Sequence, residues 1–269
     1  MSQDRPTTES RNPRASGIAS FSTREILELM NDEDATVPAV VRAAIPQIER
    51  ATDEIVASFA RGGRLRYVGA GTSGRLGVLD ASEAPPTFGV DGDMVRGIIA
   101  GGDDALRNAI EGAEDDAGAG TRDARERVRS NDVVVGVSAG GRTRYVIAAL
   151  VMAHEIGART VALTCDASSP LAQGAEIVIT LDVGPEILAG SSRLKAGTAT
   201  KLVLNMLSTA AMIRSGRTRG DLMIDLRATN TKLRERAIRM VRDETGLDED
   251  DARARLEAKG WSVRRALGR

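Results

Sequence analysis

Cysteine and histidine are almost absent from this sequence. Among its 269 residues there is one of each, Cys165 and His154. A single cysteine excludes an intramolecular disulfide, and one cysteine with one histidine cannot form a Cys/His zinc site. A chain without disulfides suits a reducing compartment, so we predict a cytoplasmic protein. We expect Cys165 to be structural and His154 to have a packing or surface role.

Aromatic residues are also scarce, at 2% of the chain. The core therefore has to be built from aliphatic side chains, and few rings are available to stack on nucleic-acid bases. The charge is balanced, because 37 basic and 38 acidic residues give a formal net charge of −1. This balance provides no overall electrostatic attraction for nucleic acid or for an anionic membrane. We predict a protein that binds neither, in which any anion site is local.

Long apolar runs are missing as well. No run reaches the roughly 20 residues that a membrane-spanning helix needs. The first residues, MSQDRPTTESRNPRAS, are polar and include acidic residues, unlike a signal peptide. A content of 42% hydrophobic and 28% charged residues is ordinary for a soluble globular protein with a sizeable core.

Five short runs rich in β-branched residues alternate with helical stretches. The runs are RLRYVG, MVRGIIA, DVVVGVS, RTVALT and EIVITL. This alternation is typical of βα units and predicts a doubly wound α/β fold, a five-stranded parallel sheet with helices on both faces. The stretch over residues 195–216 is apolar around most of its circumference, which predicts a helix buried in the core or in a subunit interface.

The chain divides into three predicted parts. Residues 1–36 form a polar arm and a short amphipathic helix, residues 37–220 form the α/β domain, and residues 221–269 form a helical C-terminal region. The apolar spacing over residues 37–61 predicts a helix with a kink at Pro46. The polar arm and the buried helix together favour a homodimer.

The segment VGAGTSGR, residues 68–75, follows a predicted strand and precedes a helix. Its glycines allow a tight turn, while Thr72 and Ser73 offer hydroxyl groups and amides at a helix N-terminus, where a phosphate binds favourably. The segment lacks the Gly-Lys-Ser/Thr ending of a Walker loop. We call it the first anion loop; the alternative is a glycine-rich connection that only turns the chain.

The segment SAGGRTRY, residues 138–145, repeats this arrangement after another predicted strand. Loops at the carboxyl ends of parallel strands converge on one crevice. We call this segment the second anion loop and predict a phosphorylated, non-nucleotide small molecule as the ligand. Arg142 and Arg144 have the alternative of being solvated surface charges. The candidate binding residues of the two loops are Gly71, Thr72, Ser73, Ser138, Gly140, Gly141, Arg142 and Thr143.

Two acidic segments follow the first anion loop. Glu83 precedes Pro85 and Pro86, which we expect to end the helix and hold the carboxyl group in place. Glu111 and Glu114 are three residues apart and are expected to share a helix face, for which a solvated surface is the usual role. The basic residues that could bind a phosphate or a carboxylate, or cover an interface, are Arg193, Lys195 and Lys201.

Six stretches of the chain resemble the SIS (sugar isomerase) domain family and, within it, the N-acetylmuramic acid 6-phosphate etherases. They are TESRNP (8–13), GAGTSGRLGVLDASEAPPTFG (69–89), AIEGAEDD (109–116), GRTRYV (141–146), GSSRLKAGTATKLVLNMLSTAAM (190–212) and LMIDLRATNTKL (222–233). The resemblance spans most of the chain. It implies an SIS-type three-layer sandwich of flavodoxin-like form with helical extensions at both ends, assembled as a homodimer.

The activity implied by the resemblance is that of a carbon–oxygen lyase. It cleaves the D-lactyl ether of N-acetylmuramic acid 6-phosphate to N-acetylglucosamine 6-phosphate and lactate in cell-wall recycling, without a metal or another cofactor. The residues that match Glu83 and Glu114 act there as the acid at the lactyl oxygen and the base at C2. An acid has to stay protonated at neutral pH, so we expect Phe88 and the two prolines to form an apolar wall around Glu83, over C3 of the sugar.

The sequence departs from the etherases at Gly140, where they usually have serine. A hydroxyl group expected to bind phosphate is therefore missing, and Ser138 or Thr143 is expected to compensate. Two other functions remain open. A sugar-phosphate sensor would bind the ligand without releasing lactate, and a sugar-phosphate isomerase would share the phosphate loops and a base at C2.

Overall fold

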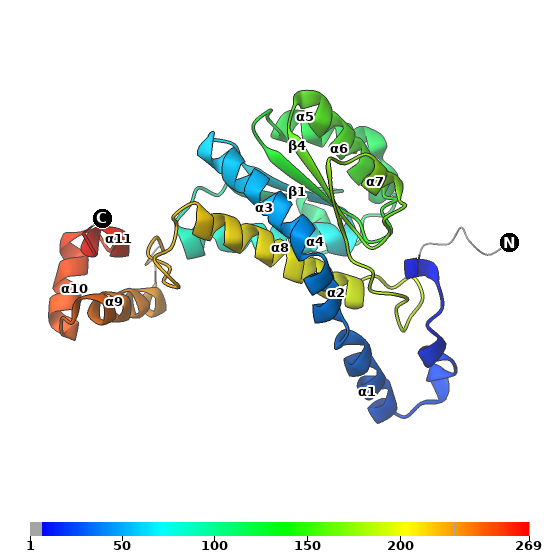
Figure 1. The fold of residues 1–269 in the computed structure, drawn as a ribbon, viewed down its shortest axis with the longest axis horizontal. Helices are drawn as coiled ribbons and strands as arrows, with labels where there is room; N and C mark the ends of the chain where they lie inside the picture. Colours follow the sequence, from blue (N-terminus) through cyan, green and yellow to red (C-terminus); the bar gives the residue numbers. More distant parts are fainter. Residues whose placement is uncertain (1–6, 227, 229, 269) are drawn as a thin grey trace.

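A computed structural model describes residues 7–226, 228 and 230–268, and Figure 1 shows its fold. At its centre is a five-stranded parallel sheet with the strand order β2-β1-β3-β4-β5. The strands are β1 (Leu65–Gly69), β2 (Val95–Ile99), β3 (Val133–Val137), β4 (Arg159–Thr164) and β5 (Ile177–Thr180). This order is that of flavodoxin-like folds, and the predicted doubly wound sheet is confirmed.

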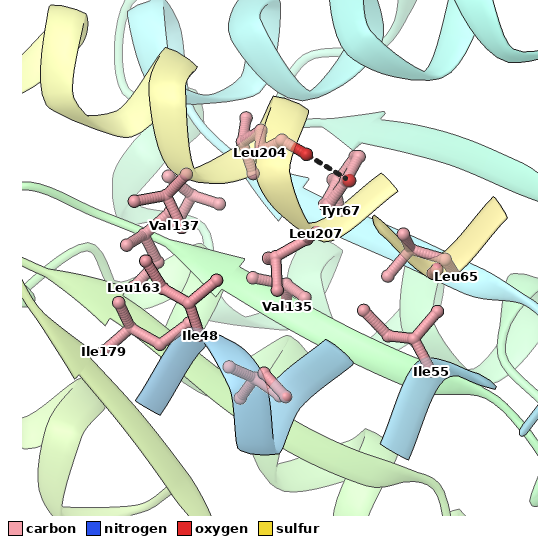
Figure 2. Close-up of a cluster of buried hydrophobic side chains, with 14 of the residues drawn as sticks. Ile48, Ile55, Leu65, Tyr67, Val135, Val137, Leu163, Ile179, Leu204 and Leu207 are labelled. Atoms are coloured by element: carbon pink, nitrogen blue, oxygen red, sulfur yellow. Dashed lines mark hydrogen bonds between the residues drawn. The ribbon is translucent and has the colours of Figure 1, made fainter. Parts of the chain in front are cut away.

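Helices cover both faces of the sheet. Those on one face are α2 (Val37–Ala43), α3 (Ile45–Ala60), α4 (Gly71–Phe88) and α8 (Lys195–Arg214), and those on the other are α5 (Ala117–Arg127), α6 (Arg144–Ile156) and α7 (Pro170–Gln173). Successive side chains of a strand point to opposite faces, so Tyr67 belongs to the first core and Val68 to the second. Figure 2 shows the first core, in which Leu204 and Leu207 of α8 lie over the sheet.

The helix predictions hold in part. The apolar stretch over residues 195–216 is α8, and it is buried in the first core as predicted. The single kinked helix expected over residues 37–61 is instead two helices, α2 and α3, separated at Ala44. Pro46 lies in the first turn of α3, where its missing N–H has no helical partner to lose. It therefore starts a helix and does not bend one.

The prediction that Pro85 and Pro86 end the helix is wrong. Both lie inside α4, which continues to Phe88 and ends at Gly89 in a left-handed conformation with φ 64°. The prolines cost α4 two backbone hydrogen bonds, but burial of Phe88 in the core holds the last turn in place. Glu83 is thus a residue of a continuous helix, not of a turn.

Helical extensions lie on two sides of the sandwich (Figure 1). The N-terminal arm contains η1 (Thr7–Glu9), η2 (Pro13–Ala15) and η3 (Ile18–Ser20) and leads into α1 (Thr23–Asp34). The C-terminal helices α9 (Thr231–Thr245), α10 (Glu249–Ala258) and α11 (Val263–Ala266) pack around a core of their own. The three-part domain division stays a prediction, and Arg227 and Thr229 of the LMIDLRATNTKL stretch lie outside the described residues.

Short 3-10 helices η4 (Asp103–Leu106) and η5 (Ala113–Asp115) connect β2 to α5. None of the helices in the described ranges combines the length and the apolar character that a membrane crossing requires.

The close packing of α5 against α6 can be tested by a substitution at Gly120. A Cβ atom at Gly120 would lie 2.1 Å from the carbonyl oxygen of Tyr145, so the two helices would have to move apart. We expect Gly120→Ala to lower the free energy of unfolding by about 1–3 kcal/mol in urea denaturation, although alanine is the better helix former. The control is Gly118→Ala in the same helix, where a Cβ atom would meet only side-chain atoms at 3.2 Å or more. Equal stability of the two variants would contradict this account.

Candidate active site

The two anion loops lie side by side. Strands β1 and β3 are neighbours, with Gly69 opposite Val137, and each loop starts directly after one of these residues. Neighbouring strands are about 4.8 Å apart. The first loop leads into α4 and the second into α6, so two helix N-termini meet at the carboxyl edge of the sheet. The structure thus brings together the two loops that the sequence predicts.

The first anion loop leaves the start of α4 open. No side chain in the described part of the chain caps this helix, and Gly71 takes the left-handed conformation with φ 52°. A Cβ atom at Gly74 would lie 2.8 Å from the carbonyl oxygen of Gly69, so the spacing Gly-x-Gly-x-x-Gly allows α4 to approach β1 closely. Thr72 and Ser73 are half-buried in the first turn. Their amides and hydroxyl groups lie at a helix N-terminus, an environment that favours an anion.

The second anion loop is more enclosed. Ser138 is 5% exposed, its Oγ accepts a hydrogen bond from the Gly141 N–H at 3.1 Å, and it lies 2.9 Å from Oγ1 of Thr143. Only one hydroxyl hydrogen is used between Ser138 and Thr143, so the other remains for a ligand. No side chain among the described residues caps α6. Arg142 is exposed, and its guanidinium lies 3.5 Å from the carboxylate of Asp166. Arg144 is exposed as well.

Glu114 lies in η5, in the connection between β2 and α5. The expectation that Glu111 and Glu114 share a helix face is wrong, because Gly112 has φ 72° and η5 is a single 3-10 turn that begins after it. This connection is tied to the first turns of α4. The guanidinium of Arg75 donates hydrogen bonds to three of its carbonyl oxygens, at 2.9–3.2 Å. The turn η5 also packs against α6, the helix that follows the second anion loop.

Glu83 lies far from the loops of its own chain. It follows Ser73 by ten residues of continuous helix, which at 1.5 Å per residue is about 15 Å along α4. Its side chain is exposed, and it borders a pocket of about 240 Å³ between α4 and α8 together with residues of the segment that follows α8. Phe88 lines this pocket from the buried core, whereas Pro86 is exposed. One chain alone therefore does not enclose Glu83 or place it beside the phosphate loops.

Asp80, three residues before Glu83, is a buried polar centre that the sequence analysis missed. It is 8% exposed and accepts hydrogen bonds from Tyr67 at 2.9 Å, Asn205 at 2.6 Å and Ser208 at 3.1 Å. These donors lower the pKa of Asp80, but the effect of burial is larger, so the pKa is raised overall. The sequence signal that could have pointed to Asp80 is its position one helical turn before Glu83. The result is a fixed junction between β1, α4 and α8 beside the Glu83 pocket.

Lys195 is 4% exposed, and its ammonium group forms an ion pair with Glu33 of α1. Glu33 also accepts hydrogen bonds from Asn12 at 2.9 Å and Arg14 at 3.0 Å. Burial alone would raise the pKa of Glu33, but the hydrogen bond and charge of Lys195, with the other donors, outweigh it and lower the pKa. The ammonium group of Lys195 is thus paired with α1 and, through Glu33, linked to Asn12 and Arg14 of the N-terminal arm.

The start of α8 differs from the starts of α4 and α6. The backbone amides of Lys195 and Ala196 donate to the carboxylate of Glu186 at 3.1 and 3.0 Å, and Glu186 is 1% exposed. A buried carboxylate of the same chain thus occupies this helix N-terminus. Nearby, Arg193 is exposed and has no ion-pair partner in the described part of the chain. Its guanidinium remains available for a ligand.

Cys165 and His154 lie where a structural role is expected. Cys165 directly follows β4 and is 6% exposed, and burial raises the pKa of its thiol to about 12. His154 is exposed in the last turn of α6, at the opposite end from the second anion loop. Within the described ranges there is no cluster of three or more His, Cys, Asp or Glu that could hold a metal ion.

Comparison with known sequences gives a consistent result. A family model described as the SIS domain matches residues 115–210, and one described as the N-terminal SIS domain of glucokinase regulatory protein matches residues 47–154. The chain is 54% identical to N-acetylmuramic acid 6-phosphate etherase 2 of Vibrio cholerae over 97% of this chain and 85% of that protein. It is 51% identical to the etherase of Caldanaerobacter subterraneus over 99% of this chain and 88% of that protein.

Comparison with solved structures supports the fold. Phosphoheptose isomerase GmhA from Neisseria gonorrhoeae aligns with a TM-score of 0.55 and 18% identity, over 71% of this chain and 98% of that chain. A phosphoheptose isomerase from Francisella tularensis aligns with a TM-score of 0.53 and 16% identity, over 71% of this chain and 98% of that chain. At these identities the likeness concerns the fold alone.

The ion pair of Lys195 and Glu33 predicts a pH-dependent loss of stability. Because the pKa of Glu33 is lowered on folding, its carboxylate stabilises the protein above its ordinary value of 4.5, and this contribution is lost as the pH falls through the lowered pKa. We expect Lys195→Met to lower the free energy of unfolding by about 3–5 kcal/mol at pH 7, and by less at acidic pH. The control is Lys201→Met, an exposed lysine of the same helix. Equal urea midpoints of the two variants at pH 7 would exclude a supporting role for the pair.

Proposed function

Since the chain belongs to the family of N-acetylmuramic acid 6-phosphate etherases, we propose that it cleaves the D-lactyl ether of N-acetylmuramic acid 6-phosphate. The products are N-acetylglucosamine 6-phosphate and D-lactate, and the reaction is that of a carbon–oxygen lyase followed by addition of water. The observation that carries this proposal is the identity of 51–54% with etherases along 97–99% of the chain. A lactate assay on N-acetylmuramic acid 6-phosphate in the presence of a metal chelator tests it directly.

The two anion loops hold the 6-phosphate. The first-turn amides of α4 and α6 point at it, and glycine at positions 71, 140 and 141 lets the backbone approach closely. The helix N-termini supply about 0.3–1 kcal/mol each, whereas each hydrogen bond to a charged group supplies about 1.5–3 kcal/mol. Affinity and orientation therefore depend mainly on hydroxyl groups and amides. The hydroxyl groups assigned to the phosphate are those of Thr72, Ser73, Ser138 and Thr143.

The basic residues have different roles. Arg142 beside the second anion loop balances the phosphate charge, and Arg193, which has no ion-pair partner within the described ranges, is assigned to the lactyl carboxylate. Lys195 supports the site indirectly, because its ammonium group is paired with Glu33 and holds the N-terminal arm. This division matches the exposure of the three side chains, since Arg142 and Arg193 are exposed and Lys195 is buried.

Direct hydrolysis of an ether at C3 is difficult because the alkoxide is a poor leaving group. Elimination avoids this difficulty. In the ring-opened aldehyde the C2 proton is acidic, so the carboxylate of Glu114 removes it while Glu83, as a carboxylic acid, protonates the lactyl oxygen as the C3–O bond breaks. A C2–C3 double bond forms and lactate leaves. Water then adds at C3, giving its proton to Glu83, and Glu114 returns a proton to C2. Both side chains end in their starting protonation states.

Glu83 acts in a site of a second copy of the chain. The 6-phosphate and C3 belong to one sugar, whereas about 15 Å of helix separates Ser73 from Glu83. The surface around Glu83 exposes three large apolar side chains of α4 and α8: Leu79 at 54%, Met206 at 39% and Ile213 at 49%. Such a surface is typical of a subunit interface. A homodimer that covers it would exclude water from Glu83 and bring it to the loops and Glu114 of the other copy.

A mixing experiment tests this arrangement. Glu83→Gln should stop lactate release but leave exchange of the C2 proton with deuterium, whereas Glu114→Gln should abolish both reactions. When the two variants are unfolded, mixed and refolded, half of the dimers are heterodimers, and each heterodimer has one site with both glutamates. We therefore expect about a quarter of wild-type activity to return.

The control for this experiment is Glu111→Gln, an exposed acid in the turn before η5, which should leave the rate unchanged. If mixing restores nothing although each variant binds product, both glutamates act within one chain and the divided site is wrong. If wild type releases no lactate, the proposed activity is wrong, and the sensor interpretation gains support. Interconversion of glucosamine 6-phosphate and fructose 6-phosphate would support the isomerase alternative.

The phosphate assignment predicts a binding defect at the first anion loop. Ser73→Ala removes a hydrogen bond to a charged group, so KM should rise about 10- to 100-fold with little change in kcat. Ser130→Ala is the control, since this exposed serine precedes β3 at the opposite edge of the sheet. Steady-state kinetics distinguishes the two variants. An unchanged KM for Ser73→Ala would place the phosphate elsewhere.

A further inference from the structure

Gly140 in the second anion loop has space for a side chain that it lacks. Gly141 beside it must be glycine, because its φ is 64° and a Cβ atom would lie 2.1 Å from Oγ of Ser169. Gly140 has no such restriction. Among the residues that the structure describes, and outside its immediate neighbours, the single atom within 4 Å of a Cβ atom placed there is Oγ1 of Thr8, at 3.8 Å. The N-terminal arm therefore presents a hydroxyl group within contact distance of the position where a side chain of residue 140 would begin.

Thr8 is buried, and its hydroxyl group is unpaired. The residue is 3% exposed, and among the residues that the structure describes its Oγ1 has no hydrogen-bond partner. In the described part of the chain, the one fully buried side-chain nitrogen or oxygen without a partner is Oγ of Ser215, so Oγ1 of Thr8 is still accessible to solvent and to a ligand. The Oγ1 atom faces the second anion loop, so a ligand bound in that loop is the partner that its position favours.

Thr8 is held in place from two sides. Its carbonyl oxygen accepts a hydrogen bond from the N–H of Gly190 at 3.0 Å. Four residues later, the side-chain amide of Asn12 donates to Glu33 at 2.9 Å and to the carbonyl oxygen of Pro185 at 3.2 Å. The arm is thus anchored on both the α1 and the α8 side of the loop. A hydroxyl group fixed before the ligand arrives binds it with little loss of conformational freedom.

The other hydroxyl groups of the loop do not fill this position. Ser138 and Thr143 lie within hydrogen-bonding distance of each other, and Ser138 also accepts the N–H of Gly141. We propose that the Thr8 hydroxyl group donates a hydrogen bond to the substrate phosphate, at the place where the etherases usually have a serine side chain in the loop. This inference rests on the proposed function. It makes the N-terminal arm part of the phosphate site.

Binding of N-acetylglucosamine 6-phosphate to Thr8→Val tests the proposal. Valine has the shape of threonine without the hydroxyl group, so calorimetry should show the dissociation constant rising about 10- to 100-fold. Thr8→Ser keeps the hydroxyl group and should bind as wild type does. Ser10→Ala is the matched control, because this serine lies on the same arm and is less buried.

A serine introduced at position 140 provides a second test. Gly140→Ser places a hydroxyl group in the space that Thr8 faces, so in this background Thr8→Val should change the dissociation constant by less than about threefold. If Thr8→Val raises the dissociation constant tenfold or more both in wild type and in Gly140→Ser, the two hydroxyl groups do not share one position, and the proposal is overturned.

The outcomes separate this inference from the proposed activity. Wild-type affinity in Thr8→Val overturns the role of Thr8, even if lactate release supports the etherase activity. Equal weakening in Thr8→Val and Thr8→Ser, with a lowered thermal midpoint, also overturns it, because the effect is then structural. Weakening confined to Thr8→Val supports the phosphate contact even if wild type releases no lactate, in which case the proposed activity alone fails.

Discussion

The in-register pairing of β1 with β3 is the constraint on which the site depends. Gly69 lies opposite Val137, so the connections that follow the two strands start next to each other. Because all five strands are parallel, both connections emerge at the carboxyl edge and both open a helix. Two helix N-termini that no described side chain caps thereby lie at the same edge of the sheet, an environment that favours an anion. The close approach of α4 to β1, which Gly74 permits, keeps this geometry compact.

Helix α4 then sets where chemistry can take place. Its first turn follows the first anion loop, and its later turns place Glu83 along the contact with α8, next to the buried Asp80. A continuous helix cannot fold back on itself, and packing of its last turn outweighs the two prolines inside it. Glu114 is different, because Arg75 ties its connection to the start of the same helix. In the proposed mechanism, one helix therefore fixes the phosphate and the base near one end and presents the acid to another chain.

Patterns local in sequence predicted much of this structure. The alternation of apolar runs gave all five strands, and the glycine and hydroxyl content gave both anion loops. Local rules failed where tertiary packing decided, as at Pro85, or where a left-handed glycine interrupted a helix, as at Gly112. Contacts between distant segments carried no local signal. The pair of Glu33 and Lys195 joins residues 162 positions apart, and only the folded chain brings Thr8 to the second anion loop.

Because the helix between Ser73 and Glu83 is too long for one chain to complete the proposed site, activity should depend on protein concentration. A site divided between two chains exists only in the associated state, so the fraction of competent sites follows the monomer–dimer equilibrium. In the proposed divided site, the catalytic rate per chain therefore falls on dilution, although each chain keeps its fold. A substrate that contacts both chains of such a dimer binds the dimer alone, so it shifts the equilibrium towards the dimer.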